Sequence, residues 1–319
     1  MPALSIVVPC FNEEACLPAL HERLSAAARS AVGEDYEIVF VNDGSRDGSA
    51  AFIEAWIKEN HRIKLIEFSR NFGHQPAITA GLHETNGDAV VIIDADLQDP
   101  PEKIPEMLEQ WKQGFMVVLA ERSGRHENVL RKCLFNFFYK LFFVLSDLPV
   151  VITSGVFGLM DRKVVTQLLN MEERNRYLPG LRGWLGYKTT TVFYERKDRA
   201  DGKPRQTLGK LIRYALNAIF SFSYKPLRLS TLIGFFTTIF FFLYGVVLMV
   251  MRLLEINVVK GFTTPTVATF LIGGLLLMSN GIIGEYIARI YDEVKKRPLY
   301  IIARKVQRKS AEAPVTEES

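Results

Sequence analysis

The sequence predicts an α/β domain, a sheet with helices on both faces, followed by two membrane-spanning helices. Short β-branched runs alternate with amphipathic stretches from the N-terminus onward, which is typical of a parallel sheet. Residues 229–251 and 261–284 carry no charge. At ~1.5 Å per helical residue each stretch is long enough to cross ~30 Å of hydrocarbon, whereas such long apolar runs are rare in soluble cores.

The first hundred residues predict four strands with helices between them. We expect strands at residues 4–8, 37–41, 64–68 and 89–93. Apolar residues three and four apart predict helices at 13–30, 49–59 and 75–85. Asn12, which is followed by two glutamates, is a favourable residue to begin the first helix. A helix to about Gln113 and a strand at 115–120 follow, and together these elements predict a Rossmann-like, nucleotide-binding domain.

Polar residues follow each predicted strand. These strand tips are residues 9–13, 42–45, 69–71 and 94–96. Ligands bind outside the carboxyl ends of the strands in an open α/β sheet, so we expect the four tips to meet at one crevice.

Two carboxylates occupy the tip of the fourth strand. Asp94 and Asp96 follow an apolar run, and Gln98 lies two positions further on. Hard oxygen ligands at this spacing suit Mg²⁺ or Mn²⁺. A divalent cation here would stabilise the negative charge that develops on a departing nucleoside diphosphate. A solvated acidic turn is the alternative, because a bare D-x-D is common on protein surfaces.

Basic residues gather beside the apolar stretches. Residues 1–195 hold 20 Lys/Arg and 26 Asp/Glu, whereas residues 196–228 hold nine Lys/Arg and two Asp. Eight Lys/Arg follow residue 285, and the link at 252–260 has two. The positive-inside rule therefore places both flanks in the cytoplasm, as does the lack of a recognisable signal peptide. The positive charge is expected to meet membrane lipids or a lipid phosphate, and not nucleic acid.

These patterns divide the chain into a cytoplasmic catalytic domain at 1–206, an interfacial amphipathic helix at 207–228, two transmembrane helices at 229–251 and 261–284, and a basic cytoplasmic tail at 285–319. An aromatic run at 133–145 fits equally a buried helix and a helix on the membrane surface.

Three motifs together resemble glycosyltransferase family 2, which has the GT-A fold. They are Val8-Pro9-Cys10-Phe11-Asn12-Glu13, Asn42-Asp43-Gly44-Ser45 and Asp94-Ala95-Asp96-Leu97-Gln98-Asp99-Pro100-Pro101. The resemblance covers nearly the whole chain and is greatest to the polyprenyl-phosphate branch, the dolichol-phosphate mannosyltransferases and bactoprenol glucosyltransferases. It implies inverting transfer of a sugar from a nucleotide sugar to a polyprenyl phosphate at the inner membrane. UDP-glucose is the first expectation; GDP-mannose and UDP-N-acetylhexosamines stay open.

The resemblance also implies roles for individual residues. The nucleotide sugar would contact Pro9, Asn12, Glu13, Asp43, Asp94, Ala95, Asp96 and Gln98. The metal would be held by Asp94, Asp96 and Gln98, and the catalytic set would be Asp94, Asp96, Arg122 and Arg131. The lipid phosphate would meet Arg131, Arg196, Arg199, Lys203 and Arg205. Arginine suits phosphate because its planar fork binds two oxygens at once, although ordinary positive-inside charge also explains the basic residues near the membrane.

One departure from the resemblance concerns the catalytic base, the group that would remove a proton from the acceptor. Many bactoprenol glucosyltransferases have an aspartate where this chain has Val156, so no carboxylate is assigned that role here. A phosphate acceptor needs no base, since a phosphomonoester has a second pKa near ~6 and is largely dianionic at neutral pH. The missing carboxylate therefore favours a phosphate acceptor over a sugar hydroxyl.

Two other functions are compatible with parts of the pattern. A processive polysaccharide synthase shares the fold, but two spans and the absence of a Q-x-x-R-W signature argue against it. A non-enzymatic scaffold or flippase partner is disfavoured by the intact Asp94, Asp96 and Gln98.

The bacterial relatives suggest a homo-oligomer that packs through the spans.

Overall fold

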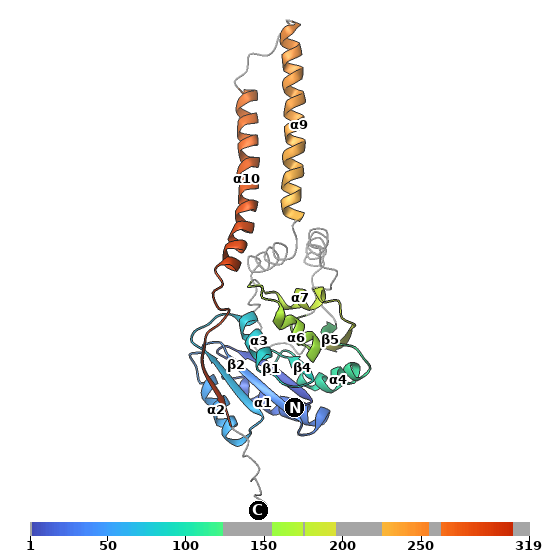
Figure 1. The fold of residues 1–319 in the computed structure, drawn as a ribbon, viewed down its shortest axis with the longest axis vertical. Helices are drawn as coiled ribbons and strands as arrows, with labels where there is room; N and C mark the ends of the chain where they lie inside the picture. The colour runs from blue at the N-terminus through green and yellow to red at the C-terminus, as the bar shows by residue number, and fades with distance from the viewer. Residues whose placement is uncertain (1, 124–154, 175, 196–224, 255–262, 309–319) are drawn as a thin grey trace, which may run out of the picture. The chain divides into compact units, whose positions relative to one another are not determined.

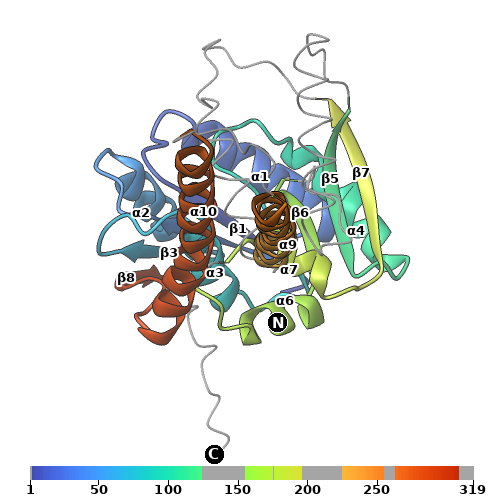
Figure 2. The same ribbon diagram turned by 90° about the horizontal axis from the view of Figure 1, so that it is seen from above.

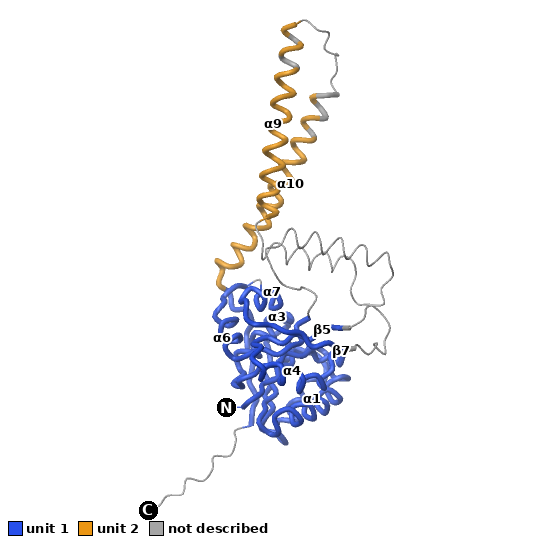
Figure 3. The backbone as a smooth tube through the Cα atoms, turned by 90° about the vertical axis from the view of Figure 1, so that its right-hand side faces the viewer, with its two compact units in different colours: residues 1–128, 148–205, 297–319 blue, residues 129–147, 206–296 orange. Residues whose placement is uncertain are grey.

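The computed structural model describes residues 2–123, 155–174, 176–195, 225–254 and 263–308. The chain forms two compact units (Figure 3). The first contains residues 1–128, 148–205 and 297–319, and the second contains residues 129–147 and 206–296. The first unit therefore takes its residues from before, between and after the two segments of the second.

In the described part of the chain, eight strands form one sheet in the order β7-β5-β6-β4-β1-β2-β3-β8. Their bounds are β1 Leu4–Cys10, β2 Tyr36–Asn42, β3 Ile63–Phe68, β4 Ala89–Ile92, β5 Val117–Ser123, β6 Gly158–Asp161, β7 Thr189–Glu195 and β8 Ile302–Gln307. The predicted parallel arrangement is confirmed for β1 to β4. The whole sheet is mixed, because β6 runs antiparallel to β4 and β5, and β8 runs antiparallel to β3.

Helices cover both faces of this sheet. They are α1 Leu17–Val32, α2 Ser49–Glu59, α3 His74–His83, α4 Ile104–Lys112, α6 Arg162–Asn170 and α7 Leu178–Trp184, with a 3₁₀ turn η1 at Pro101–Lys103. Apolar residues of α1, α2 and α4 share one buried cluster with Ile6 and Ile38 of the sheet. Ala77 and Ala80 of α3 join a second cluster with Val41. Helices α1 and α3 lie on opposite sides of the sheet (Figures 1 and 2).

The first helix begins later than the sequence predicts. Asn12 was expected to start it, but α1 begins at Leu17 and Asn12 has a φ of 55°. The Asn12 side chain instead accepts a hydrogen bond from the Arg46 N–H at 2.9 Å, and the Asn12 N–H donates to Ser45 Oγ at 3.0 Å. These two bonds join the tips of β1 and β2. The positive φ is tolerated because Asn adopts the left-handed conformation more readily than most other non-glycine residues.

Two long helices follow, α9 Lys225–Leu253 and α10 Thr263–Val294. Among the described residues they contain two segments long and apolar enough to cross a membrane, 225–247 and 271–294, with mean hydropathies of 1.9 and 1.5. Residues 225–228, expected in the interfacial helix, belong to α9, and the rest of that segment lies outside the described residues. The aromatic run at 133–145 also lies outside them.

Residues 285–308, which the sequence analysis assigned to the basic tail, contain the end of a helix and a strand. Helix α10 continues to Val294, and Arg289 donates to Glu285 Oε1 at 2.9 Å, a pair one helical turn apart. Residues 302–307 then form β8 at the edge of the sheet. The strand was not predicted because most of its side chains are exposed and it has no run of apolar residues. Arg304 pairs with Glu54 and Glu67, and Lys305 pairs with Glu84.

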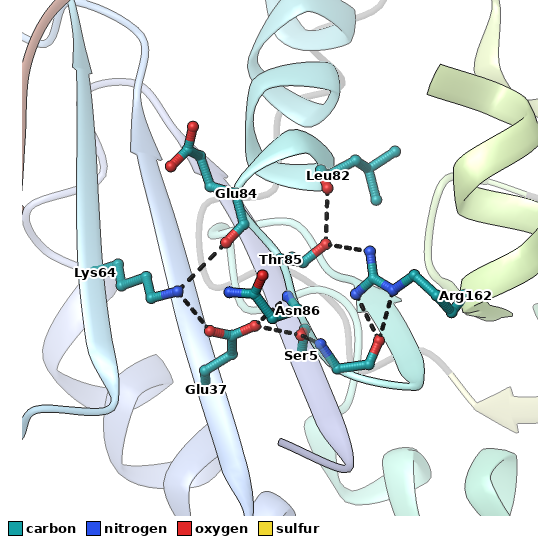
Figure 4. A network of polar contacts seen from close by, with 9 residues as sticks. Ser5, Glu37, Lys64, Leu82, Glu84, Thr85, Asn86 and Arg162 are labelled. Atoms are coloured by element: carbon teal, nitrogen blue, oxygen red, sulfur yellow. Dashed lines mark hydrogen bonds and ion pairs between the residues drawn. The ribbon is translucent and has the colours of Figure 1, made fainter. Parts of the chain in front are cut away.

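A polar network joins the amino-terminal ends of three strands (Figure 4). Glu37 is 5% exposed, and its carboxylate accepts from Ser5 Oγ and the Asn86 N–H, each at 2.6 Å, and pairs with Lys64 Nζ at 2.7 Å. Ser5 Oγ accepts in turn from the Gly87 N–H at 2.7 Å. Burial acts to raise the pKa of Glu37, but these partners outweigh it, so the pKa is lowered.

This network predicts a pH-dependent contribution to stability. Because the folded pKa of Glu37 lies below its unfolded value, the stabilisation is present above about pH 4.5 and is lost as the pH falls through the folded pKa. Glu37→Gln is expected to destabilise the protein by about 2 kcal/mol at pH 7, and the difference from wild type should shrink on acidification. The measurement is the free energy of unfolding of the wild type and the variant, as full chains in detergent, at pH 7 and at an acidic pH below the folded pKa of Glu37.

The exposed pair of Lys103 and Glu106 provides the control. Glu106→Gln should leave stability within about 0.5 kcal/mol of wild type at each pH, because exposed ion pairs contribute little. Equal effects of Glu37→Gln and Glu106→Gln would contradict the assignment.

Candidate active site

The strand order reverses beside β1, where the sequence predicts the ligand site. The chain proceeds from β1 outward to β2 and β3, and then returns to place β4 on the other side of β1. The loop after β1 and the Asp94–Asp96 turn after β4 therefore follow neighbouring strands. In open α/β sheets this reversal is where ligands bind.

Asp94 is held by a histidine that the sequence analysis did not select. His74 is the first residue of α3, and its Nε2 lies 2.8 Å from Asp94 Oδ1. Burial acts to lower the pKa of His74, but the bond to Asp94 and the charges of Asp43 and Asp96 outweigh burial, so its pKa is raised. The helix predicted from the spacing of apolar residues begins one residue later, at Gln75, so this spacing gave no indication that His74 lies near the strand tips.

The turn after Asp94 is tightly shaped. Ala95 is buried, and Asp96 Oδ1 accepts a hydrogen bond from the Gln98 N–H at 3.2 Å. Leu97 between them has a φ of 59°. A non-glycine residue in this conformation is uncommon and costs about 1 kcal/mol, and such strain is concentrated at functional sites. The turn thus fixes the backbone that carries the second carboxylate.

The residues of this turn suit a hard divalent cation. Asp94 and Asp96 supply half-buried carboxylate oxygens. In the described ranges no three His, Cys, Asp or Glu side chains gather as a metal cluster. A hard divalent cation is commonly held by one or two carboxylates together with substrate phosphate and water. Gln98 Nε2 is buried and has no hydrogen-bond partner among the described residues. A diphosphate oxygen is an acceptor that would satisfy it.

Asp43, at the tip of β2, holds the loop that precedes His74. Asp43 is 4% exposed, and its carboxylate accepts hydrogen bonds from the Phe72 N–H at 2.6 Å and the Gly73 N–H at 2.9 Å. Burial raises the pKa of Asp43, and the two backbone bonds oppose this only in part. The predicted contact with the nucleoside stays a prediction, and the structure adds a role in fixing residues 69–73, which we call the β3–α3 loop.

Arg122 forms a hydrogen-bonded group with Tyr194 and Asp99, the residue that follows Gln98 of the acidic turn. Its Nε donates to Tyr194 Oη at 3.0 Å, and the Tyr194 hydroxyl donates to Asp99 Oδ1 at 2.5 Å. Burial, and secondarily the bond to Asp99, raises the pKa of Tyr194 to about 12, so the phenol stays protonated. Burial raises the pKa of Asp99, to which the charges of Asp94 and Asp96 add. This arrangement orients the guanidinium, whose predicted contact with phosphate stays a prediction.

The other predicted site residues divide into two groups. Of those that the structure describes, Pro9 is buried within β1, and Glu13 is half-buried and donates its N–H to Ser49 Oγ at 3.2 Å. Val156, the position that lacks the carboxylate, is half-buried. The predicted lipid-phosphate group lies outside the described residues; it comprises Arg131, Arg196, Arg199, Lys203 and Arg205.

Comparison with known proteins gives a family match. A model described as Glycosyl transferase family 2 matches residues 5–169. YkcC of Bacillus subtilis, an uncharacterized glycosyltransferase, is 42% identical over 93% of this chain and 92% of its own length. The SfII prophage-derived bactoprenol glucosyl transferase of Shigella flexneri is 41% identical over 94% of this chain and 97% of its own. Glucosyl-3-phosphoglycerate synthase from Mycobacterium tuberculosis, solved with UDP, has a TM-score of 0.46 and 20% identity over 69% of this chain and 79% of its own.

Proposed function

We propose, from the premise that this chain belongs to glycosyl transferase family 2, that it transfers glucose from UDP-glucose to polyprenyl phosphate. The resemblance predicted from the three motifs, and with it the GT-A fold, is confirmed. The observation that carries the proposal is the acidic turn of Asp94 and Asp96 at the point where the strand order reverses, in a chain that also contains two apolar helices. The near full-length similarity to bactoprenol glucosyl transferases supports glucose as the sugar and a polyprenyl phosphate as the acceptor.

The reaction is a single displacement with inversion. A phosphate oxygen of the lipid forms a bond to the anomeric carbon while the bond from that carbon to UDP breaks, and the electron pair leaves with UDP. No enzyme nucleophile takes part, because the acceptor phosphate is already ionised at neutral pH. The absence of a carboxylate at Val156 agrees with an acceptor that needs no base.

Each group of the site has one task in this mechanism. Asp94 and Asp96 would hold Mg²⁺ or Mn²⁺, which, when bound, stabilises the charge of the leaving diphosphate. Gln98 and Arg122 would donate hydrogen bonds to diphosphate oxygens, and Asp43 would fix the loop that borders the nucleoside. Positively charged residues outside the described ranges would receive the lipid phosphate.

The two apolar helices associate the enzyme with a membrane, and we place the catalytic unit on its cytoplasmic side. The basic flanks, together with a donor made in the cytosol, support this orientation. A multi-pass anchor in the inner membrane would keep the enzyme in the bilayer that holds the acceptor lipid. We further propose that copies of the chain assemble through the helices.

The test is product formation from purified components. Full-length protein in detergent is incubated with labelled UDP-glucose, undecaprenyl phosphate and Mn²⁺, and the lipid fraction is analysed. The proposal predicts an acid-labile, lipid-linked glucose and release of UDP in equal amount. Labelled lipid from GDP-mannose or a UDP-N-acetylhexosamine alone would overturn the donor assignment, and absence of lipid product with every donor would overturn the function.

The contact between His74 and Asp94 gives a prediction about metal binding. Residues that orient a ligand of a metal typically contribute about 10- to 100-fold to its affinity. His74→Ala is therefore expected to raise the Mn²⁺ concentration for half-maximal activity about tenfold, because Asp94 loses its bond. His83→Ala, at the other end of the same helix, is the matched control and should leave the Mn²⁺ requirement unchanged.

A further inference from the structure

The β3–α3 loop is supported on its outer side by the segment that follows α10. The Ser69 N–H donates to the carbonyl oxygen of Ile301 at 3.0 Å. The ring of Tyr300 stacks on Phe68, the last residue of β3, with centroids 5.0 Å apart and planes 9° from parallel. Both contacts are made where the strand becomes the loop.

A bulge places this stacking contact. The pairing of β3 with β8 runs from Glu67 opposite Arg304 to Phe68 opposite Ile302, so Ala303 is an extra residue on β8. Bulges bend a strand and redirect its side chains, and they are frequent beside active sites. The bulge therefore turns the chain that leads back to Tyr300 at the end of β3 nearest the crevice.

A continuous series of contacts leads from Tyr300 to the acidic turn. Phe68, on which Tyr300 stacks, makes a T-shaped contact with Phe72, and the two ring centroids are 5.7 Å apart. The N–H groups of Phe72 and Gly73 bind Asp43, and the next residue, His74, binds Asp94. The loop is thus bound by Asp43 and by the segment containing Tyr300, and the residue that follows it, His74, binds Asp94.

We infer that Tyr300 is a positioning residue for the donor site, acting through Phe68 and the β3–α3 loop on Asp43 and Asp94. It lies in the segment between the second apolar helix and β8, within the same compact unit as the sheet. This inference rests on the proposed function. It assigns to the C-terminal segment a part in donor recognition in addition to completing the sheet.

The experiment compares full-length variants in UDP-glucose binding and turnover with Mn²⁺. Tyr300→Ala is expected to raise the KM for UDP-glucose and its Kd about fivefold, with kcat within about twofold, as expected for the loss of one aromatic pair. Tyr300→Phe should restore wild-type values, because the ring keeps its stacking. The matched control is Val306→Ala, which removes a partly buried side chain from β8 away from the loop and should lower Tm without changing KM.

The outcomes separate positioning from stability. A lower Tm with an unchanged KM in Tyr300→Ala would show a purely structural role and overturn the inference. So would equal increases of KM in Tyr300→Ala and Val306→Ala. Should Tyr300→Ala fail to fold, Tyr300→Leu, which keeps apolar volume without a ring, must show the same rise in KM. Wild-type protein that binds no UDP-glucose would overturn the proposed donor as well, whereas normal wild-type binding with unaffected variants overturns this inference alone.

Discussion

Asp96→Ala is expected to lower kcat for lipid glucosylation about 10³-fold, since removal of a group that stabilises developing charge costs 10² to 10³ in rate. Asp96→Asn separates charge from structure. The amide oxygen can still accept the bond from the Gln98 N–H, so the turn keeps its shape while the site loses a negative charge. We expect Asp96→Asn to keep the wild-type Tm and to lose activity nearly as completely as Asp96→Ala. The measurement is initial rate at saturating UDP-glucose over a range of Mn²⁺ concentrations.

Asp88 provides a matched control at the other end of the same strand. Its carboxylate is exposed, and its backbone, which substitution keeps, bonds to Pro2 and Arg162. Asp88→Ala should retain kcat within about twofold, because surface substitutions usually have small effects. Activity of Asp96→Ala comparable to that of Asp88→Ala would show that the acidic turn takes no part in the chemistry.

Gly44→Ala is expected to disrupt the donor site through the backbone. Gly44 has a φ of 70°, and a Cβ there would lie 2.6 Å from the carbonyl carbon of Arg70 and 2.7 Å from the Asn71 nitrogen. The added methyl group must displace the β3–α3 loop, which Asp43 holds by two hydrogen bonds. We expect a loss of about 3 kcal/mol in stability and a rise of about tenfold or more in the KM for UDP-glucose.

Gly33 separates conformational strain from collision. Its φ is 64°, but a Cβ there would meet no atom within 4 Å. Gly33→Ala should therefore cost only the strain of the left-handed conformation, about 1 kcal/mol, with an unchanged KM. Thermal denaturation and steady-state kinetics of the two variants provide the test, and a normal KM in Gly44→Ala would contradict the role assigned to the loop.

The sequence predicted the first half of the sheet well because β1, β2 and β4 are buried along their whole length and consist mainly of apolar residues. Helix 49–59 was predicted with its observed bounds. Prediction was weaker where structure depends on distant partners. β8 is a mostly exposed edge strand, and it becomes a strand because β3 offers it hydrogen bonds, which no local pattern reveals.

The same distinction applies to the site. Asp94, Asp96 and Gln98 follow a buried strand in a recognisable motif, so the sequence alone could place them at the crevice. His74, Tyr194 and Asp99 matter through contacts with residues that are distant in sequence, such as the bond between Tyr194 and Asp99. A single histidine at the start of a helix or a tyrosine within a strand gives no signal of this kind.

The position of β8 at the C-terminus sets the order in which the enzyme can be assembled. During translation β1, β2 and β3 leave the ribosome early, but the strand that covers β3 is synthesised only after both apolar helices. Until then β3 presents unpaired backbone groups, which are a site for aggregation or for chaperone binding. Nascent chains released before residue 302 would keep this open edge, so maturation of the sheet is completed only once the anchor has been made.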